Sequence, residues 1–165
     1  MGTPENALIV QATKKDVDLL TRLIRDSFTD VANRFELTPE NCPKHPSNYS
    51  QKRVEIDLER GVRYYILIVD GTAVGCVGVE KASQLACYME RLAVLPQHRG
   101  KGYGAGLARH AMEQARVLGA STVGIGIIAA DTGLKDFYTS LGFEEGETKT
   151  FPHLPFAVAF LNVLV

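Results

Sequence analysis

The spacing of apolar residues near the start of the chain predicts an amphipathic helix. Four apolar side chains recur every three or four positions and would share one helix face: Val17, Leu20, Ile24 and Phe28. We expect this helix to run from Lys14 to about Asn33. Thr13 is suited to be its N-cap, and Asp16, three residues later, completes an approximate capping box.

Other apolar and alternating segments predict strands separated by helices. The predicted strands are Leu8–Ala12, Val62–Val69, Ala73–Lys81, Leu85–Val94, Ser121–Ile128 and Phe156–Val165. Further helices are expected at Gln51–Arg60, after a glycine-rich segment as far as Leu118, and at Leu134–Leu141. Asp70-Gly71 suits a two-residue hairpin turn. A meander of hairpins followed by β-α-β units predicts an α/β (α+β) fold, with a mixed, mostly antiparallel central sheet and helices on both faces.

The composition narrows the functional class only modestly. A length of 165 residues predicts a single domain spanning 1–165, and a formal net charge of -1 gives no reason to expect a nucleic-acid partner. The longest apolar stretch, Phe156–Val165, is too short to span a membrane, so no membrane partner is expected. Three cysteines without a leader sequence favour a cytoplasmic protein with free thiols.

The segment Gln97–Gly106, between a predicted strand and a predicted helix, carries the strongest chemical signal. Its last seven positions include four glycines, which leave the backbone N–H groups of the turn open to a ligand. Arg99 and Lys101 add positive charge, and the positive end of the following helix points to the same place. This combination predicts a pyrophosphate site.

More than one ligand would satisfy such a turn. Gly100–Ala105 formally matches the G-x-G-x-x-A dinucleotide fingerprint, so a nicotinamide-dependent oxidoreductase is one alternative. The four residues Pro96–Arg99 separate the glycines from the preceding strand, however, whereas in a dinucleotide-binding unit the glycines follow the strand directly. A glycine-rich turn without a ligand is the other alternative.

A wider stretch, Glu90–Gly104, resembles the acyl-CoA-binding motif Q/R-x-x-G-x-G/A of the GNAT superfamily of N-acetyltransferases, with Gln97, Gly100 and Gly102 at the motif positions. Phe137–Phe143 resembles a second signature of that family, F-Y-x-x-x-G-F. The resemblance implies a GNAT-like fold and an acyl-CoA-dependent N-acetyltransferase that uses acetyl-CoA as cosubstrate and no metal. A non-catalytic acyl-CoA-binding regulatory module is the alternative.

The resemblance also implies a cofactor site in two parts. Backbone amides of the turn bind the CoA pyrophosphate, and free backbone groups of the central strand pair with the pantetheine arm. The residues implied are Leu92, Ala93, Val94, Gln97, Arg99, Gly100, Lys101, Gly102, Tyr103 and Gly104. Many family members carry an Asn contact after the next strand, where this chain has Asp131; Thr132 and Lys135 are the candidates to replace that contact.

Two residues are candidates for catalysis. Tyr138 matches the tyrosine that lies near the CoA sulfur in the family and would donate a proton to the departing thiolate, the alternative being a core tyrosine. Strand alternation places Tyr88, Glu90 and Leu92 on one face. A carboxylate in this apolar strand, Glu90, would take the proton of the amine, the alternative being an ion pair with Arg91 or Lys81.

The expected acceptor is a small-molecule or peptide amine. The proline-rich segment Thr38–Ser50 and the segment Phe151–Pro155 would form the walls of its pocket. Candidate contacts, whose carboxylates suit a cation, are Glu36, Glu40, Asn41, His45, Asn48 and Tyr49. Cys42 and His45 form a C-x-x-H segment, but two ligands do not make a zinc site. A homodimer paired through the apolar C-terminal strand is also left open.

Overall fold

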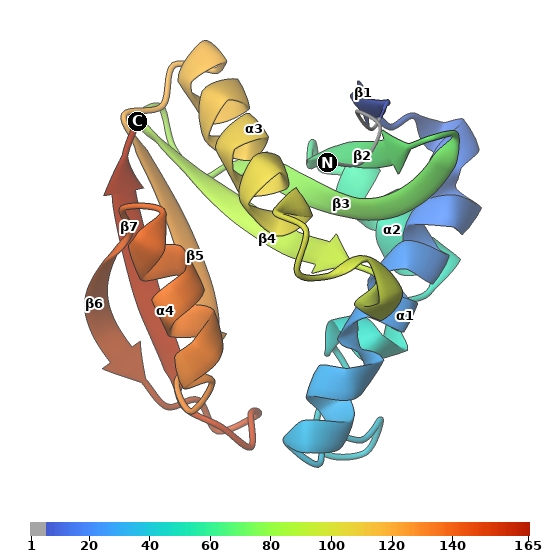
Figure 1. The fold of residues 1–165 in the computed structure, drawn as a ribbon. Helices are drawn as coiled ribbons and strands as arrows, with labels where there is room; N and C mark the ends of the chain where they lie inside the picture. Colours follow the sequence, from blue (N-terminus) through green and yellow to red (C-terminus); the bar gives the residue numbers. More distant parts are fainter. Residues whose placement is uncertain (1–5) are drawn as a thin grey trace.

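The computed structural model of the protein describes residues 6–165, which form one seven-stranded sheet with helices against it (Figure 1). The strands are β1 (Ala7–Gln11), β2 (Arg63–Val69), β3 (Thr72–Lys81), β4 (Ala86–Val94), β5 (Thr122–Ile128), β6 (Glu144–Lys149) and β7 (Val158–Leu164). The helices are α1 (Val17–Arg34), α2 (Gln51–Glu59), α3 (Tyr103–Val117) and α4 (Thr132–Ser140). The strand order is β1-β2-β3-β4-β5-β7-β6. Within residues 6–165, β4 and β5 are parallel and the other neighbours are antiparallel, so the predicted mixed sheet is confirmed.

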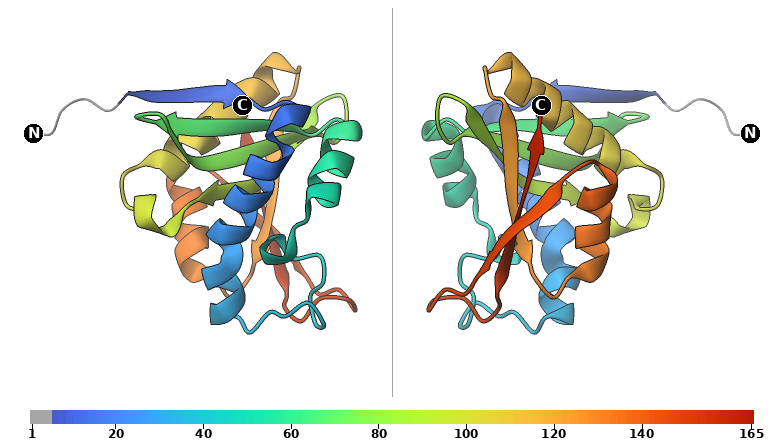
Figure 2. Two further views of the ribbon diagram at one scale, coloured as in Figure 1. Left: turned by 90° about the vertical axis from the view of Figure 1, so that its right-hand side faces the viewer. Right: turned by 90° about the vertical axis from the view of Figure 1, so that its left-hand side faces the viewer.

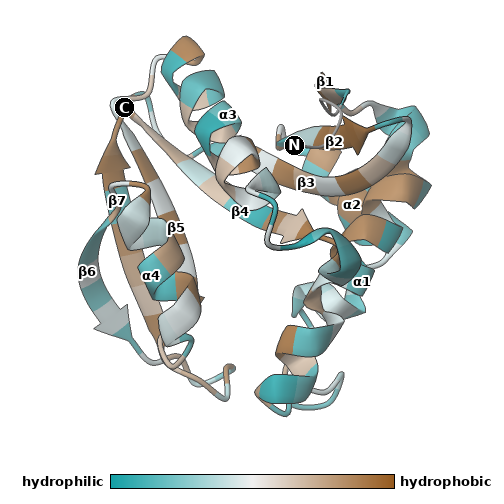
Figure 3. Ribbon diagram, in the orientation of Figure 1, coloured by the Kyte–Doolittle hydropathy of each residue, from teal (hydrophilic) through white to brown (hydrophobic). Residues whose placement is uncertain are grey.

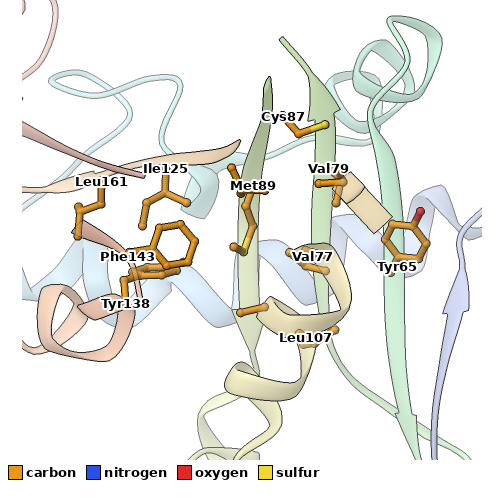
Figure 4. Close-up of a cluster of buried hydrophobic side chains, with 14 of the residues drawn as sticks. Tyr65, Val77, Val79, Cys87, Met89, Leu107, Ile125, Tyr138, Phe143 and Leu161 are labelled. Atoms are coloured by element: carbon orange, nitrogen blue, oxygen red, sulfur yellow. The ribbon is translucent and has the colours of Figure 1, made fainter. Parts of the chain in front are cut away.

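Helices cover both faces of the sheet, as the sequence predicted. Figure 2 shows α1 and α2 on one side and α3 and α4 on the other. The apolar stripe of α1, including Leu20 and Ile24, is buried with Val54 of α2 against β2 and β3. On the opposite face Leu107 of α3 packs with residues of the central strands, and Figure 4 shows Tyr138 and Phe143 grouped with Ile125 and Leu161.

The local signals in the sequence produce the expected turns. Thr13 and Asp16 form a capping box, in which the Thr13 N–H donates to Asp16 Oδ2 at 2.8 Å. The first turn, Lys14–Asp16, is a 3-10 helix, and the α-helix begins at Val17. Asp70 and Gly71 have φ values of +49° and +82°, the left-handed pair that a tight two-residue hairpin requires.

The sequence did not predict strand β6, and the reason is its composition. All six residues of Glu144–Lys149 are exposed and none is a large apolar residue, so no alternation marks the strand. Figure 3 shows this hydrophilic strand beside the hydrophobic β7. Because β7 lies between β5 and β6, both of its edges are paired within the described residues, and the homodimer that the sequence left open stays a prediction.

Strand β4 has two irregularities that shape the molecule. It pairs with β5 only from Ala86 to Tyr88, and beyond that point the two strands diverge (Figure 1). Its register with β3 shifts opposite Cys76–Gly78, and Arg91 has a left-handed φ of +50°, which together mark a β-bulge.

The bulge reverses the alternation of side chains along β4. Met89 and Leu92 both pack with the core under α3, whereas Ala93 packs with the core under α1. The prediction that Leu92 shares a face with Tyr88 and Glu90 is therefore wrong, because the extra residue moves every later side chain to the opposite face.

The cysteines, a possible metal site and a possible membrane span were the features that the composition raised. Cys42, Cys76 and Cys87 are buried free thiols. Cys42 and His45 are joined by a backbone hydrogen bond of 3.1 Å. Within residues 6–165, no three His, Cys, Asp or Glu side chains gather closely enough to hold a metal ion. No helix of that region combines the length and apolarity needed to cross a membrane.

Candidate active site

A cavity of about 980 Å³ opens where β4 and β5 separate. Its walls come from α1, β4, the turn before α3, β5, α4 and the start of β7. The predicted site residues that line it are Glu90, Leu92, Ala93, Val94, Arg99, Gly100, Gly102, Tyr103, Gly104 and Tyr138. The predicted residues that lie outside it are Gln97, Lys101, Thr132 and Lys135. The structure thus brings the two sequence motifs to one opening in the sheet.

The glycine turn has the backbone geometry of an anion site. Gly100 and Gly102 have φ values of +78° and +83°, in a backbone region that residues other than glycine rarely adopt. Within residues 6–165, the amides of Gly100, Lys101 and Gly102 donate to no backbone carbonyl. The first amides of α3 follow directly, and a helix N-terminus carries partial positive charge. The turn can therefore offer several N–H groups to a phosphate.

The Arg99 side chain is engaged in holding the fold. Its guanidinium donates to Asp30 Oδ2 at 2.7 Å, to the Ser27 carbonyl at 2.6 Å and to the Val94 carbonyl at 2.9 Å. Burial alone would raise the pKa of Asp30, but the hydrogen bond and charge of Arg99 outweigh burial and lower that pKa. Arg99 therefore connects α1 to the end of β4 through these hydrogen bonds, and Asp30 pairs with its positive charge.

Asp131, at the position of the family's Asn contact, has two local roles. It is 7% exposed, accepts the Leu134 N–H at 3.2 Å as the N-cap of α4, and pairs with Arg34 Nη2 at 2.8 Å. Arg34 lies at the end of α1, so this ion pair spans the opening and neutralises the carboxylate. Lys135, which was expected to replace the Asn contact, instead pairs with Glu145 at 3.0 Å outside the cavity.

Glu90 combines cavity exposure with a perturbed acidity. Its side chain is 16% exposed and lies 3.3 Å from Arg91 Nη2 and 3.7 Å from Arg60 Nη2. Burial raises the pKa of Glu90 to about 7, with a further raising effect from the carboxyl of Glu80 that Arg91 and Arg60 only partly offset. The predicted ion pair with Arg91 is present, yet the carboxylate can gain or lose a proton near neutral pH.

A buried polar cluster behind Glu90 was not predicted from the sequence. Asp57 of α2 is 0% exposed and accepts from the hydroxyls of Tyr49 at 2.8 Å and Tyr64 at 2.7 Å. It also accepts from Arg91 Nη2 at 3.2 Å, which orients the neighbour of Glu90. The available signal was the position of Asp57, three residues after Val54 and so on the buried face of the predicted helix.

Arg60 connects this cluster to the cavity. Its guanidinium contacts three carboxylates, those of Asp57, Glu80 and Glu90. The three come from α2, β3 and β4, so a single side chain fixes their relative placement. In the register of β3 with β4, Glu80 lies opposite Tyr88. Because Tyr88 and Glu90 are on the same face of β4, Glu80 lies beside Glu90 on that face of the sheet.

Tyr138 reaches the same cavity from α4. It is 6% exposed, and its ring lies edge-on to Phe137 and Phe143, with centroid distances of 5.1 Å and 5.3 Å. Burial raises the pKa of its phenol, which therefore stays protonated at neutral pH. Tyr138 is both a core residue and a cavity residue, so the two predicted roles are compatible.

The acceptor side differs from the sequence-based expectation. Of the six candidate contacts, His45 alone lines the cavity in the described residues. The Asn41 side chain bonds within its own loop, and Tyr49 is turned toward Asp57. The opposite wall comes from Phe156 and β7, whereas Phe151–Pro155 lies outside. The carboxylates expected to attract a cation, Glu36 and Glu40, are therefore not in the cavity.

Solved structures show the same fold. The paia N-acetyltransferase from Thermoplasma acidophilum, in complex with coenzyme A, superposes with a TM-score of 0.80 at 15% identity, over 97% of this chain and 99% of that chain. The structure of yncA from Salmonella typhimurium, with its cofactor acetyl-CoA, superposes with a TM-score of 0.70 at 17% identity, over 96% and 93%.

Sequence comparison shows the family. The uncharacterized N-acetyltransferase YjgM of Escherichia coli (strain K12) is 26% identical over 144 residues, covering 86% of this chain and 84% of the relative. Residues 22–143 match the model of the acetyltransferase (GNAT) family. The chain therefore belongs to the GNAT family and is an acyl-CoA-dependent acetyltransferase.

Proposed function

We propose that the protein transfers the acetyl group of acetyl-CoA to a primary amine by direct attack in a ternary complex, with residues 1–165 as one acetyltransferase domain. The observation that supports this most is the placement of Glu90. A carboxylate whose pKa is raised to about 7 lies in the cavity next to the opening between β4 and β5. A general base works best with a pKa near the working pH.

Acetyl-CoA would bind along the opened edge of β4. Within residues 6–165, β5 does not pair with β4 beyond Tyr88, so the edge at Leu92, Ala93 and Val94 could pair with the pantetheine amides as an added strand would, with the Val94 carbonyl also accepting from Arg99. The pyrophosphate would lie on the amides of the turn from Arg99 to Gly104, with Lys101 as an exposed cation nearby. The thioester would then lie between Glu90 and Tyr138.

The proposed reaction uses these two residues in turn. Glu90 takes a proton from the ammonium group, and the neutral nitrogen attacks the thioester carbonyl carbon. The C–N bond forms, the C–S bond breaks, and the thiolate of CoA leaves. The nitrogen, now bonded to the acetyl carbon, loses its second proton to solvent, and Glu90 releases the proton it took. Tyr138, protonated because burial raises its pKa, donates its proton to that thiolate and regains one from solvent. The presence of both groups in one cavity favours an enzyme over a non-catalytic acyl-CoA-binding module.

The test is the rate of CoA thiol release with an amine acceptor. Glu90→Gln keeps the shape of the side chain and removes the base, so kcat/KM should fall by about 100-fold or more, while acetyl-CoA affinity measured by calorimetry is retained. The matched control is Glu113→Gln on the surface of α3, where Glu113 pairs with Arg116 at 2.6 Å. Full activity of Glu90→Gln would refute the assignment of the base.

A further inference from the structure

Apolar side chains line the cavity on both sides of its opening. On the sheet, Phe160 and Val158 of β7 line it together with Phe156. Across the opening, α1 contributes Phe28 and Val31. Figure 1 shows this end of α1 facing β5 and β7, and Figure 3 shows the hydrophobic character of both strands.

Two glycines on β5 clear the space in front of this wall. Gly124 and Gly126 pair with Asn162 and Phe160 on β7, and all four line the cavity. Ile125 and Ile127, on the alternate face of β5, join the core under α4 and also reach the cavity, whereas Ile128 lies on the same face as the two glycines, opposite Val158, and lines the cavity with them. The wall is therefore formed by β7 side chains and Ile128 beside the bare backbone of the two glycines, and it faces the opening.

The wall lies on the same face of the sheet as the proposed base. Tyr88 of β4 and Gly124 of β5 are the last residue pair before the strands diverge. Two residues further along the same face, β4 carries Glu90 and β5 carries Gly126, whose partner is Phe160. An amine held at Glu90 would thus direct its body toward Phe160.

The charges in the cavity balance one another. The ionisable acids and arginines that line it are Asp30, Glu90 and Asp131, with Arg34, Arg91 and Arg99. Asp30 pairs with Arg99 at 2.7 Å, Asp131 with Arg34 at 2.8 Å and Glu90 with Arg91 at 3.3 Å. No surplus of carboxylates exists among these lining residues, so the site does not match a polyamine or a polycationic sugar.

We propose that the acceptor carries a single amine on an apolar body, an aryl or branched alkyl group. The inference rests on the proposed function and deepens it. A free arylalkylamine and a peptide with an apolar N-terminal residue present the same chemistry, an amine one or two carbons from an apolar group. In either case the amine would meet Glu90 while the apolar body lies between Phe28 and Phe160.

The experiment compares acceptors in the thiol-release assay at saturating acetyl-CoA. The probes are phenethylamine, a tetrapeptide with N-terminal Phe, spermidine and ethylamine. We expect kcat/KM for phenethylamine or the peptide to exceed those for spermidine and ethylamine by at least about tenfold, the discrimination that one methylene can give in an apolar pocket. The ratio of phenethylamine to the peptide then identifies the source of the amine.

The outcomes distinguish a failure of the acceptor class from a failure of the proposed acetyl transfer. Faster turnover of spermidine than of phenethylamine would overturn the inference on the acceptor and leave amine acetylation standing. Retained acetyl-CoA binding without turnover of any of the four amines would overturn the proposed function itself, and with it the acceptor class.

Two variants test the wall directly. Phe160→Asp adds an unpaired carboxylate, and should lower kcat/KM for phenethylamine about tenfold or more while raising that for spermidine. In Gly126→Ala the new Cβ would lie 3.2 Å from Val158 Cγ1 and 3.4 Å from Phe160 Cε1, and must displace those side chains. It should raise KM for phenethylamine more than for ethylamine, the internal control. Unchanged selectivity in a folded Gly126→Ala protein would refute the role of the wall.

Discussion

The carboxyl of Glu80 should set the pH at which the enzyme becomes active. Glu80 lies on β3 beside Glu90 and shares Arg60 with it. Burial is the first cause of the raised pKa of Glu90, and Glu80 adds a hydrogen bond and a like charge in the same direction. Glu80→Gln removes the like charge and leaves Arg60 freer to favour the ionised form of Glu90. Both effects lower the pKa of Glu90.

The size of the effect follows from the ionised fraction of Glu90. A neighbouring like charge moves a carboxyl pKa by about one unit or more. A decrease of about one unit from the value of about 7 would raise the ionised fraction at pH 6 from about one-tenth to about one-half. Since the base acts in its ionised form, kcat/KM at pH 6 should rise about fivefold, and at pH 8 it should change little.

The assay is kcat/KM for CoA thiol release between pH 5.5 and 9, with the thermal midpoint measured alongside. The acid limb of the profile should move to lower pH in Glu80→Gln, and the plateau should stay in place. Lys81→Gln, next in sequence, is the control for a general change of charge. An acid limb that stays unchanged in a folded Glu80→Gln protein, or that moves to higher pH, would refute the coupling between Glu80 and Glu90.

Two further substitutions test the proposed proton donor and the buried cluster behind Glu90. Tyr138→Phe should lower kcat by about tenfold or more while the acetyl-CoA affinity measured by calorimetry is retained, because it removes only the proton donor; an unchanged kcat would leave Tyr138 with a core role alone. Asp57→Asn should lower the free energy of unfolding by about 3 kcal/mol in urea denaturation, because it removes the fully buried carboxylate that pairs with Arg60 and Arg91 and leaves Arg91 with Glu90 alone. A loss below about 0.5 kcal/mol would show that Tyr49 and Tyr64 hold the cluster without that charge.

The elements that the sequence predicted best are those with a strong apolar period. The stripe from Val17 to Phe28 gives α1, and the alternation in Ser121–Ile128 gives β5. Strand β6 lacks such a period because it is an exposed edge, stabilised by pairing with β7 rather than by burial. The bulge at Arg91 was not predictable, since its left-handed φ falls on a residue other than glycine.

The candidate site was predictable where it depends on backbone motifs. The glycine turn and Tyr138 are local in sequence, and both line the cavity. The pKa of Glu90 depends instead in part on Glu80 and Arg60, which are brought next to it by the strand register and by the packing of α2. The proposed acceptor site likewise combines residues of α1 and β7, more than one hundred residues apart in sequence.

The central claim is that acetyl-CoA binds in the opening between β4 and β5 with its pyrophosphate on the glycine turn. Calorimetric titration of the wild-type protein and of Gly102→Val with acetyl-CoA tests it most directly, with NADH as the control ligand. A β-branched residue is strained at the φ of +83° and would cover the amides of the turn. The account predicts saturable acetyl-CoA binding by the wild-type protein, no NADH binding, and loss of acetyl-CoA binding in a folded variant. Wild-type affinity retained in Gly102→Val, or no acetyl-CoA binding by the wild-type protein, would contradict it.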